Sequence, residues 1–478
     1  MSSEKSELVA SLLARTLKEW NRPKPSRWSP FYSTYKALHM NPGLSGEEDY
    51  AANAIFDEMN KIKDLLETGS GEFRGSFNIF RNFGKNDDED NPCGPSVVAV
   101  LRNWGDLETH EPGPVVLLRA DTDALPVSED NDIDYASQVK DTMHACGHDM
   151  HIATLLAAVR LLVGIKDHWT GTLIACFQPC EETGTGALSM VEGGLYDKPD
   201  DVPTPNFVFG GHVTPERAGS VSLTHGTAYS RSDSWKITMK GKGGHSSRPE
   251  ACIDPVVMAA YAITRLQTVV SRVVPSTSAG VLTVGAIHAG KAPNIIPGEA
   301  YFTVNIRADS NGLATRMKDE MDSIVRAEVQ ASYGGTGIDP EEDNPLFEPL
   351  LYAPILYNEE PIATDIATVF SAVFGSEFKD FVPGVSGSED FPFLANVHVE
   401  DPERHIPYCY WRFGGTDQKL FDDNHGDVNK LPSNHNKAYL PQCKLEVDGD
   451  PLKAGTKAMC AAALSQFRLV STDQTGSN

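Results

Sequence analysis

The chain lacks long apolar stretches and has few basic side chains. No window of its 478 residues approaches the roughly eighteen apolar residues of a transmembrane helix, and residues 1–30 lack the continuous apolar stretch of a secretory signal. The 41 Lys and Arg residues are outnumbered by 66 Asp and Glu residues, which gives a net charge of −25. Such a chain repels phosphate groups and anionic lipid, so we expect neither nucleic acid nor a membrane as a partner.

Several sequence signatures of other protein classes are also missing. The eight cysteines are scattered without the dense, paired spacing of a disulfide framework, so we expect a reduced, cytoplasmic protein. No Gly-x-Ser-x-Gly elbow occurs between a strand and a helix, which argues against a serine triad. The Gly-rich loop at residues 241–249 does not have the spacing of a phosphate-binding loop.

The first half of the chain alternates between strand and helix patterns. The length of the whole chain, 478 residues, favours two domains. Nearly all-apolar runs at residues 96–101, 114–119, 171–178 and 206–211 predict strands buried on both faces, and helices are predicted at residues 4–20, 47–66 and 152–163. This alternation predicts a three-layer α/β domain.

The pattern changes from about residue 231. Strands are predicted at residues 235–240, 280–288, 300–308 and 347–356, and helices at 255–274 and 313–332. The order strand-helix-strand-strand-helix-strand is typical of a ferredoxin-like α+β unit. A helix at 361–374 and a strand at 381–385 then resume the α/β pattern. We therefore predict an α/β domain at 1–229 and 358–478, with an inserted α+β ferredoxin-like domain at 230–357.

One short segment concentrates side chains that bind metals. Residues 144–151 read His-Ala-Cys-Gly-His-Asp-Met-His, just before a predicted helix. Thiolate, imidazole and carboxylate groups together suit zinc and similar divalent ions. Cys146 alone could be an ordinary buried thiol and His148 a core histidine, but the density of ligand types favours a metal site.

Further polar residues follow the ends of predicted strands. Glu181 and Glu182 come after one strand; one of the two can coordinate a metal while the other accepts a proton from water. A solvated acidic pair at a helix start is the ordinary alternative, which the flanking Gly and Pro residues disfavour. His212 follows another strand, and His435 lies in a polar loop. Strand ends meet at one edge of an α/β sheet, so these residues predict a metal-dependent hydrolase with a site at that edge.

Two Gly-rich loops are suited to contact a substrate. His245 is held among glycines at residues 241–249, where it can donate a hydrogen bond to a substrate oxygen. Gly387 and Ser388 lie in the loop 384–391, which resembles a platform of backbone donors.

These motifs together resemble the metal-dependent amidohydrolases that include auxin-conjugate hydrolases, hippurate hydrolases and N-acyl-amino-acid deacylases. The resemblance is carried, in family order, by residues 39–42, 45–48, 119–126, 144–151, 178–187, 210–212, 241–249, 292–297, 387–391 and 432–435. Cys180 departs from the family pattern, because many relatives have Ala there. The N-terminal helix and a loop at 398–425 also have no clear counterpart in the family.

The resemblance implies a set of roles for individual residues. It implies two divalent ions, zinc or manganese, held by Cys146, His148, Glu182, His212 and His435. Glu181 would be the general base and later the general acid. The inserted domain would act as a lid and form a homodimer, with His245 reaching the oxyanion across the interface and Asn294, Gly387 and Ser388 binding substrate.

The predicted reaction is hydrolysis of a small-molecule amide, the bond between an acyl group and an amino acid. Three alternatives stay open at this stage. The chain could be a carboxypeptidase, an amide-forming relative in secondary metabolism, or a catalytically silent binding homologue.

Overall fold

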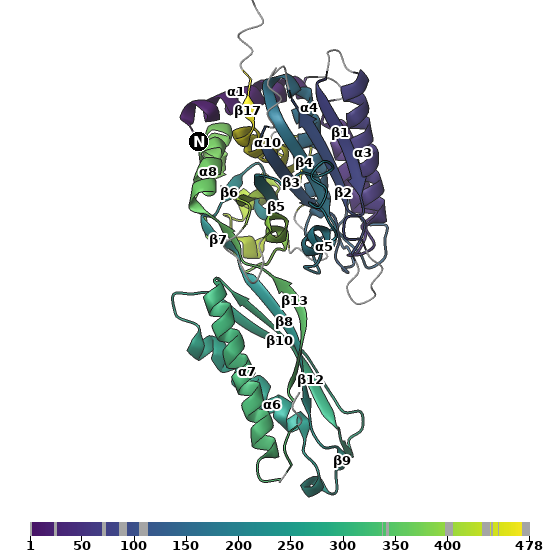
Figure 1. Cartoon of the computed structure of the whole chain (residues 1–478), viewed down its shortest axis with the longest axis vertical. Helices are drawn as coiled ribbons and strands as arrows, with labels where there is room; N and C mark the ends of the chain where they lie inside the picture. The colour runs from purple at the N-terminus through teal and green to yellow at the C-terminus, as the bar shows by residue number, and fades with distance from the viewer. Residues whose placement is uncertain are drawn as a thin grey trace, which may run out of the picture. The chain divides into compact units, whose positions relative to one another are not determined.

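The computed structural model divides the chain into two compact units. It describes residues 2–22, 26–68, 73–85, 93–104, 113–336, 338–340, 344–396, 405–432, 440, 443–447 and 449–470. The first unit contains Met1–Gly226, Tyr357–Pro383 and Asp390–Asn478, and the second contains Thr227–Leu356 and Gly384–Glu389 (Figure 1). The chain passes between them at β7 (Gly226–Tyr229) and β14 (Leu356–Asn358).

A mixed, nine-stranded sheet forms the centre of the first unit. Its order is β1 (Gly75–Arg81), β2 (Val97–Asn103), β4 (Trp169–Gln178), β3 (Val115–Asp121), β5 (Phe207–Arg217), β16 (Tyr408–Thr416), β6 (Val221–Leu223) and β15 (Phe378–Lys379), with β17 (Arg468–Leu469) beside β4. β3 runs parallel to both β4 and β5. The carboxyl ends of these three strands therefore lie at the same edge of the sheet.

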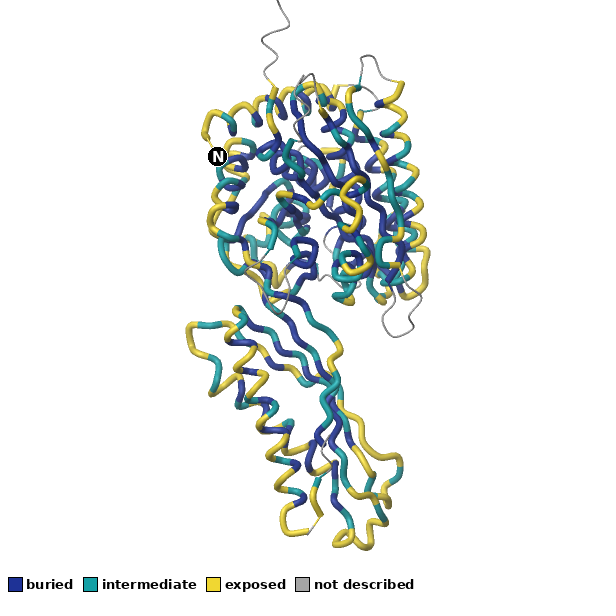
Figure 2. The backbone as a smooth tube through the Cα atoms, in the orientation of Figure 1, coloured by how far each residue is buried: buried dark blue, intermediate teal, exposed yellow. Residues whose placement is uncertain are grey.

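Helices cover this sheet. α3 (Asp49–Thr68), α4 (His148–Gly164), α10 (Pro451–Gln466) and α8 (Glu360–Phe374) contact one another in succession and pack on the strands, and α1 (Ser3–Trp20) and α2 (Ser29–Met40) pack against them. α5 (Gly186–Glu192) and the 3-10 turn Phe391–Ala395 contact β4 and β5, and α9 (Gln418–Asp423) contacts β5. Figure 2 shows the buried core running through the central strands.

Burial explains the sequence of the central elements. Every residue of β4 is buried, and α4 is buried on nearly all sides, so both are mainly apolar and neither has a polar, solvent-facing side. Gly147, directly before α4, has φ of 86°, a left-handed conformation that favours glycine. A side chain there would also collide with Val213 and Leu440.

The second unit is built on a four-stranded antiparallel sheet. Its order is β10 (Gly280–Ala289), β12 (Glu299–Ala308), β8 (Arg231–Lys240) and β13 (Leu346–Ala353). The helices α6 (Pro255–Thr268) and α7 (Asn311–Tyr333) pack on this sheet and share an apolar core with it. A two-stranded sheet pairs β9 (Gly244–His245) with β11 (Ile295–Ile296). The lid and dimerisation roles predicted for the inserted domain stay predictions.

The structure corrects several predicted elements. Residues 381–385 do not form a strand; Pro383 has no N–H for a sheet ladder, and Phe381 has φ of 55°. Part of the predicted loop 398–425 is the buried strand β16, between β5 and β6. β5 continues to Arg217, so His212 lies inside the strand and not after it. Among the described residues, no helix is both long and apolar enough to cross a membrane.

Candidate metal centre

Most of the predicted ligands meet at the edge where β3, β4 and β5 lie side by side. Cys146 and His148 stand at the start of α4, Glu182 follows β4, and His212 lies in β5. Ligand atoms of Cys146, His148 and Glu182 lie within 4.8 Å of one another. His435, the fifth predicted ligand, lies outside the described residues.

Two atoms of this cluster are suited to hold a cation. Nε2 of His148 and Oε1 of Glu182 are 3.8 Å apart, and both are buried without a hydrogen-bond partner among the described residues. A buried polar atom left without a partner is costly, and a metal ion would satisfy both at once. Burial, followed by the charge of Glu182, raises the pKa of the Cys146 thiol well above its usual value. A cation is therefore needed to make Cys146 a thiolate ligand.

The charge around His148 also fits a divalent cation. Its ring nitrogens lie 3.6 Å from Asp121, 3.2 Å from Asp123, 3.9 Å from Glu181 and 3.8 Å from Glu182. Burial lowers the pKa of His148, but Asp121, Asp123 and Glu182 raise it to about 10. Even with Arg119 beside Asp121, the four carboxylates outnumber the cationic side chains next to them, and divalent ions would balance the remaining charge.

Asp121 and His151 form a second possible ligand group with His148, but their atoms are already engaged. Nδ1 of His151 lies 2.5 Å from Asp121 Oδ1, and Nε2 accepts the Val213 N–H at 2.8 Å. The other oxygen of Asp121 accepts a hydrogen bond from Arg119 at 2.6 Å. These hydrogen bonds fix the orientation of the His151 ring and of the Asp121 carboxylate.

Asp123 fixes the orientation of His148. Its Oδ1 accepts from Nδ1 of His148 at 3.2 Å, and its Oδ2 accepts from Ser45 Oγ at 2.7 Å and from the Glu182 N–H at 2.9 Å. Because Asp123 binds Nδ1, it is Nε2 of His148 that could coordinate a cation. Carboxylate–histidine pairs of this kind are typical supports of metal ligands.

His212 is held as a neutral imidazole. Its Nδ1 donates to the Val213 carbonyl at 2.5 Å, and its ring centroid lies 5.8 Å from that of His148. Burial, together with the charge of His151, lowers the pKa of His212 to about 3. A neutral ring whose Nδ1 donates a hydrogen bond presents Nε2 as a metal ligand.

Glu181 is carried by a tight turn at the end of β4. Cys180 has φ of 56°, and the Gly184 N–H closes the turn on the Glu181 carbonyl at 2.7 Å. The Glu181 side chain is 11% exposed, and its Oε2 lies 3.9 Å from Nε2 of His148. This carboxylate therefore adjoins the metal cluster and also reaches solvent.

A buried network that the sequence did not reveal supports this edge. Arg119, 1% exposed, donates to Asp121, to Gln178 at 2.9 Å and to Asp390 at 3.2 Å. Asp390 also accepts the Ala187 N–H at 2.9 Å. The predicted donor loop 384–391 thus ends in a buried acceptor. An arginine inside an otherwise apolar strand was the only available signal.

The other predicted substrate residues belong to the second unit and do not lie together. His245 is paired with Ile295, next to Asn294, whereas Ser388 accepts from Arg307 and the Gly387 carbonyl accepts from Ser230. These two groups flank opposite ends of the ten-residue strand β8, about 30 Å apart at ~3.3 Å per residue.

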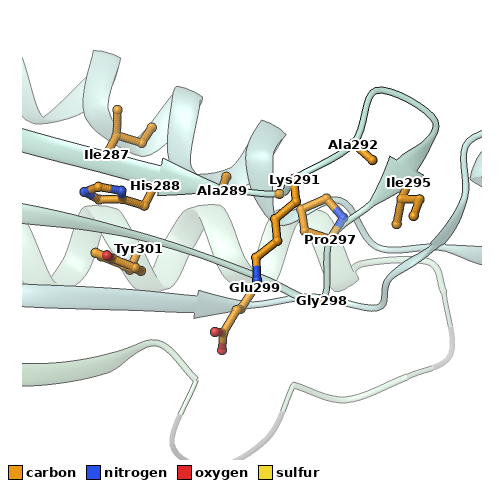
Figure 3. A pocket seen from close by; sticks show the side chains of 11 residues that line it. Ile287, His288, Ala289, Lys291, Ala292, Ile295, Pro297, Gly298, Glu299 and Tyr301 are labelled. Atoms are coloured by element: carbon orange, nitrogen blue, oxygen red, sulfur yellow. The ribbon is translucent and has the colours of Figure 1, made fainter.

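A cavity of about 760 Å³ lies at the His245 end of the second unit. The ends of β10 and β12 and the segment between them line it, and the rings of His288 and Tyr301 stack there at 4.7 Å (Figure 3). None of its lining residues is a candidate metal ligand, so this cavity is not the metal centre.

Comparison with known proteins identifies the family. Residues 117–430 match peptidase family M20/M25/M40. The chain is 31% identical to thermostable carboxypeptidase 2 of Saccharolobus solfataricus, over 90% of this chain and 93% of that protein. It is 34% identical to hippurate hydrolase of Campylobacter jejuni, over 75% of this chain and 83% of that one.

Solved structures share the fold. A Bacillus subtilis protein described as a dinuclear metal binding peptidase matches with a TM-score of 0.62 at 22% identity, covering 92% of this chain and 97% of that one. The family match confirms the predicted resemblance: the chain belongs to peptidase family M20/M25/M40 and is a metal-dependent hydrolase of amide bonds.

Proposed function

We propose that the chain hydrolyses the amide bond between an acyl group and an amino acid. The observation that carries this proposal is the cluster of Cys146, His148 and Glu182 with Glu181 beside it. Relatives named hippurate hydrolase and N-acetyl-L-cysteine deacetylase support the substrate class.

The site residues suit two divalent ions, zinc or manganese. The proposed ligands are Cys146, His148, Glu182, His212 and His435. When bound, the ions polarise the scissile carbonyl and lower the pKa of a water molecule at the site. The mixed set of thiolate, imidazole and carboxylate suits zinc more than manganese, and both stay within the proposal.

Glu181 is the proposed proton carrier. Its carboxylate takes a proton from the attacking water and gives it to the leaving nitrogen. Partial exposure of the side chain supports this role, because a carboxylate that reaches solvent can exchange its proton after each turnover. Asp123 and Asp121 hold the histidines in place and transfer no proton.

The second unit is proposed to pair two copies of the chain. Large apolar residues are exposed on α6 and on the edge strand β10: Val256, Val257, Tyr261, Val281 and Ile287. Large apolar side chains exposed on neighbouring elements favour a protein interface. Because His245 and Ser388 are about 30 Å apart along β8, one copy does not bring both to one substrate. We propose that His245 and Asn294 act on the substrate of the partner copy.

A carboxypeptidase activity is the second candidate. Two relatives that match over 90% of this chain are named thermostable carboxypeptidases.

The eight free thiols support a reduced, cytoplasmic location.

A substrate panel tests the proposal. Purified protein reconstituted with zinc or manganese is incubated with N-acetyl and N-benzoyl amino acids and with unblocked dipeptides, and release of free amino acid is measured. The proposal predicts metal-dependent cleavage of the blocked substrates. Faster cleavage of unblocked dipeptides would favour the carboxypeptidase, and absence of both turnover and bound metal would indicate a silent homologue.

A further inference from the structure

A second buried carboxylate faces the turn that carries Glu181. Glu48 is fully buried, and its Oε1 accepts the N–H of Cys180, the residue before Glu181, at 2.9 Å. Asp123 accepts the N–H of Glu182, the residue after Glu181, at 2.9 Å. The backbone on each side of Glu181 is therefore tied to a buried carboxylate.

The same short segment supports both ties. Ser45 donates to the Asp123 oxygen that holds Glu182, and Glu48 holds Cys180 directly. The Ala124 N–H also donates to the Gly43 carbonyl at 2.8 Å, which fixes the segment against the loop after β3. These contacts come from a part of the chain more than a hundred residues before Glu181.

The Glu48 carboxylate binds the Cys180 turn and not the helix that follows Glu48 in the chain. It stands directly before α3, where a carboxylate commonly caps the first amides of a helix. Here, however, its Oε1 is directed to Cys180, and its Oε2 has no hydrogen-bond partner among the described residues. Gly94 leaves room for Oε2, because a Cβ there would lie 1.7 Å from it.

We propose that Glu48 is a positioning residue for the reaction: it fixes the turn Cys180–Glu182 so that Glu181 meets the attacking water. The turn has a left-handed conformation at Cys180, which residues other than glycine rarely adopt, and the hydrogen bond from Glu48 opposes its relaxation. The inference rests on the proposed function, because it assumes that Glu181 carries the proton. Glu48 is not one of the proposed metal ligands or substrate-binding residues.

Three variants separate this role from a general structural one. Glu48→Ala removes the acceptor, Glu48→Gln keeps an oxygen acceptor without the charge, and Glu47→Ala removes an exposed neighbouring carboxylate. In the metal-free protein we expect amide hydrogen exchange at residues 180–182 to be about tenfold faster in Glu48→Ala. Glu48→Gln and Glu47→Ala should exchange like the wild type.

Kinetics of the metal-loaded enzyme complete the test. A displacement of about 1 Å at a catalytic group lowers the rate by about 100-fold, so we expect kcat to fall by that factor in Glu48→Ala with KM nearly unchanged. Glu48→Gln should restore kcat. If Glu48→Ala does not fold, Glu48→Asp, which withdraws the acceptor but keeps the charge, should show the same loss.

The outcomes separate the two hypotheses. Wild-type protein that cleaves no N-acyl amino acid would overturn the proposed function. Active wild type, with Glu48→Ala or Glu48→Asp unchanged in exchange and in kcat, would overturn only the positioning role. Equal losses in Glu48→Gln and Glu48→Ala would also overturn it, because the charge and not the acceptor would then matter.

Discussion

The loops after β3 and β4 each carry two carboxylates, yet the two pairs lie in different surroundings. Asp121 and Asp123 are 0% and 1% exposed. The side chains of Glu181 and Glu182 are 11% and 19% exposed. Both pairs lie within 3.9 Å of His148, so proximity to the metal ligands does not distinguish them.

Hydrogen bonding distinguishes the two pairs. Asp121 accepts from Arg119 and His151, and Asp123 accepts from His148, Ser45 and the Glu182 amide. Although burial alone would raise the pKa of Asp121, Arg119 and the histidines hold it well below its usual value. Burial instead raises the pKa of Glu182, whose Oε1 has no partner among the described residues. The two aspartates are thus held by several hydrogen bonds, whereas Glu182 keeps one buried oxygen that a cation could satisfy.

The largest predicted effect is loss of turnover in Glu181→Gln. General base catalysis contributes about 10²–10⁴ in rate, so kcat should fall by that factor. Metal content should stay at the wild-type level, because the ligands are intact. Metal analysis and initial rates of the same preparation check this. Glu192→Gln, an exposed glutamate at the end of α5, is the control. Near-normal turnover of Glu181→Gln would contradict the division between the two pairs.

A smaller loss is expected for Asp123→Asn. The amide cannot accept from Ser45, His148 and the Glu182 amide as the carboxylate does, so metal affinity or kcat should fall by about 10–100-fold. A metal titration followed by activity separates the two effects, with the exposed Asp132→Asn as control. A loss as large as that of Glu181→Gln would mean that Asp123 takes part in the chemistry.

A pH-dependent stability is expected from His39 and the buried carboxylate of Asp149, at the start of α4. Asp149 pairs with His39 at 2.6 Å, and His39 also contacts Glu129 at 3.0 Å. Burial lowers the pKa of His39, but Asp149 and Glu129 raise it to about 9. The contribution to stability, about 3 kcal/mol, is complete below the unfolded pKa of ~6.5 and is lost as pH rises through about 9.

Urea unfolding between pH 6 and pH 10 measures this loss. His39→Gln should remove the loss of stability centred near pH 9 and lower the free energy of unfolding by about 3–5 kcal/mol, because it leaves buried carboxylates without a countercharge. An unchanged profile in His39→Gln would show that the pair does not stabilise the fold.

Sequence reasoning located elements whose pattern is local and missed those fixed by distant contacts. The apolar runs of β3 and β4 marked both strands and the positions of the carboxylates after them. β16 was missed, because its aromatic run is flanked by charged residues and its place between β5 and β6 depends on long-range pairing. α4 begins at His148, earlier than predicted, because its polar first turn is buried by the site.

For the candidate site, the sequence predicted the residues that meet at the sheet edge but not the hydrogen bonds that hold them there. Cys146, His148, Glu182 and His212 were named from residue type and lie at one sheet edge. Their catalytic and ligand roles remain proposals. The hydrogen bonds that Glu48, Ser45 and Arg119 form at the site were not predicted, because a hydrogen bond between residues far apart in sequence leaves no local pattern.

Cobalt substitution tests the central claim most directly. If Cys146 is a metal ligand, cobalt-loaded protein shows a thiolate-to-cobalt charge-transfer band that is lost in Cys146→Ser. Cys180 is the matched control: its Sγ accepts the Gly94 N–H at 3.3 Å and lies 3.5 Å from Glu48, so Cys180→Ser should keep the band. A band that survives in Cys146→Ser, or that disappears in Cys180→Ser alone, would contradict the assigned metal centre.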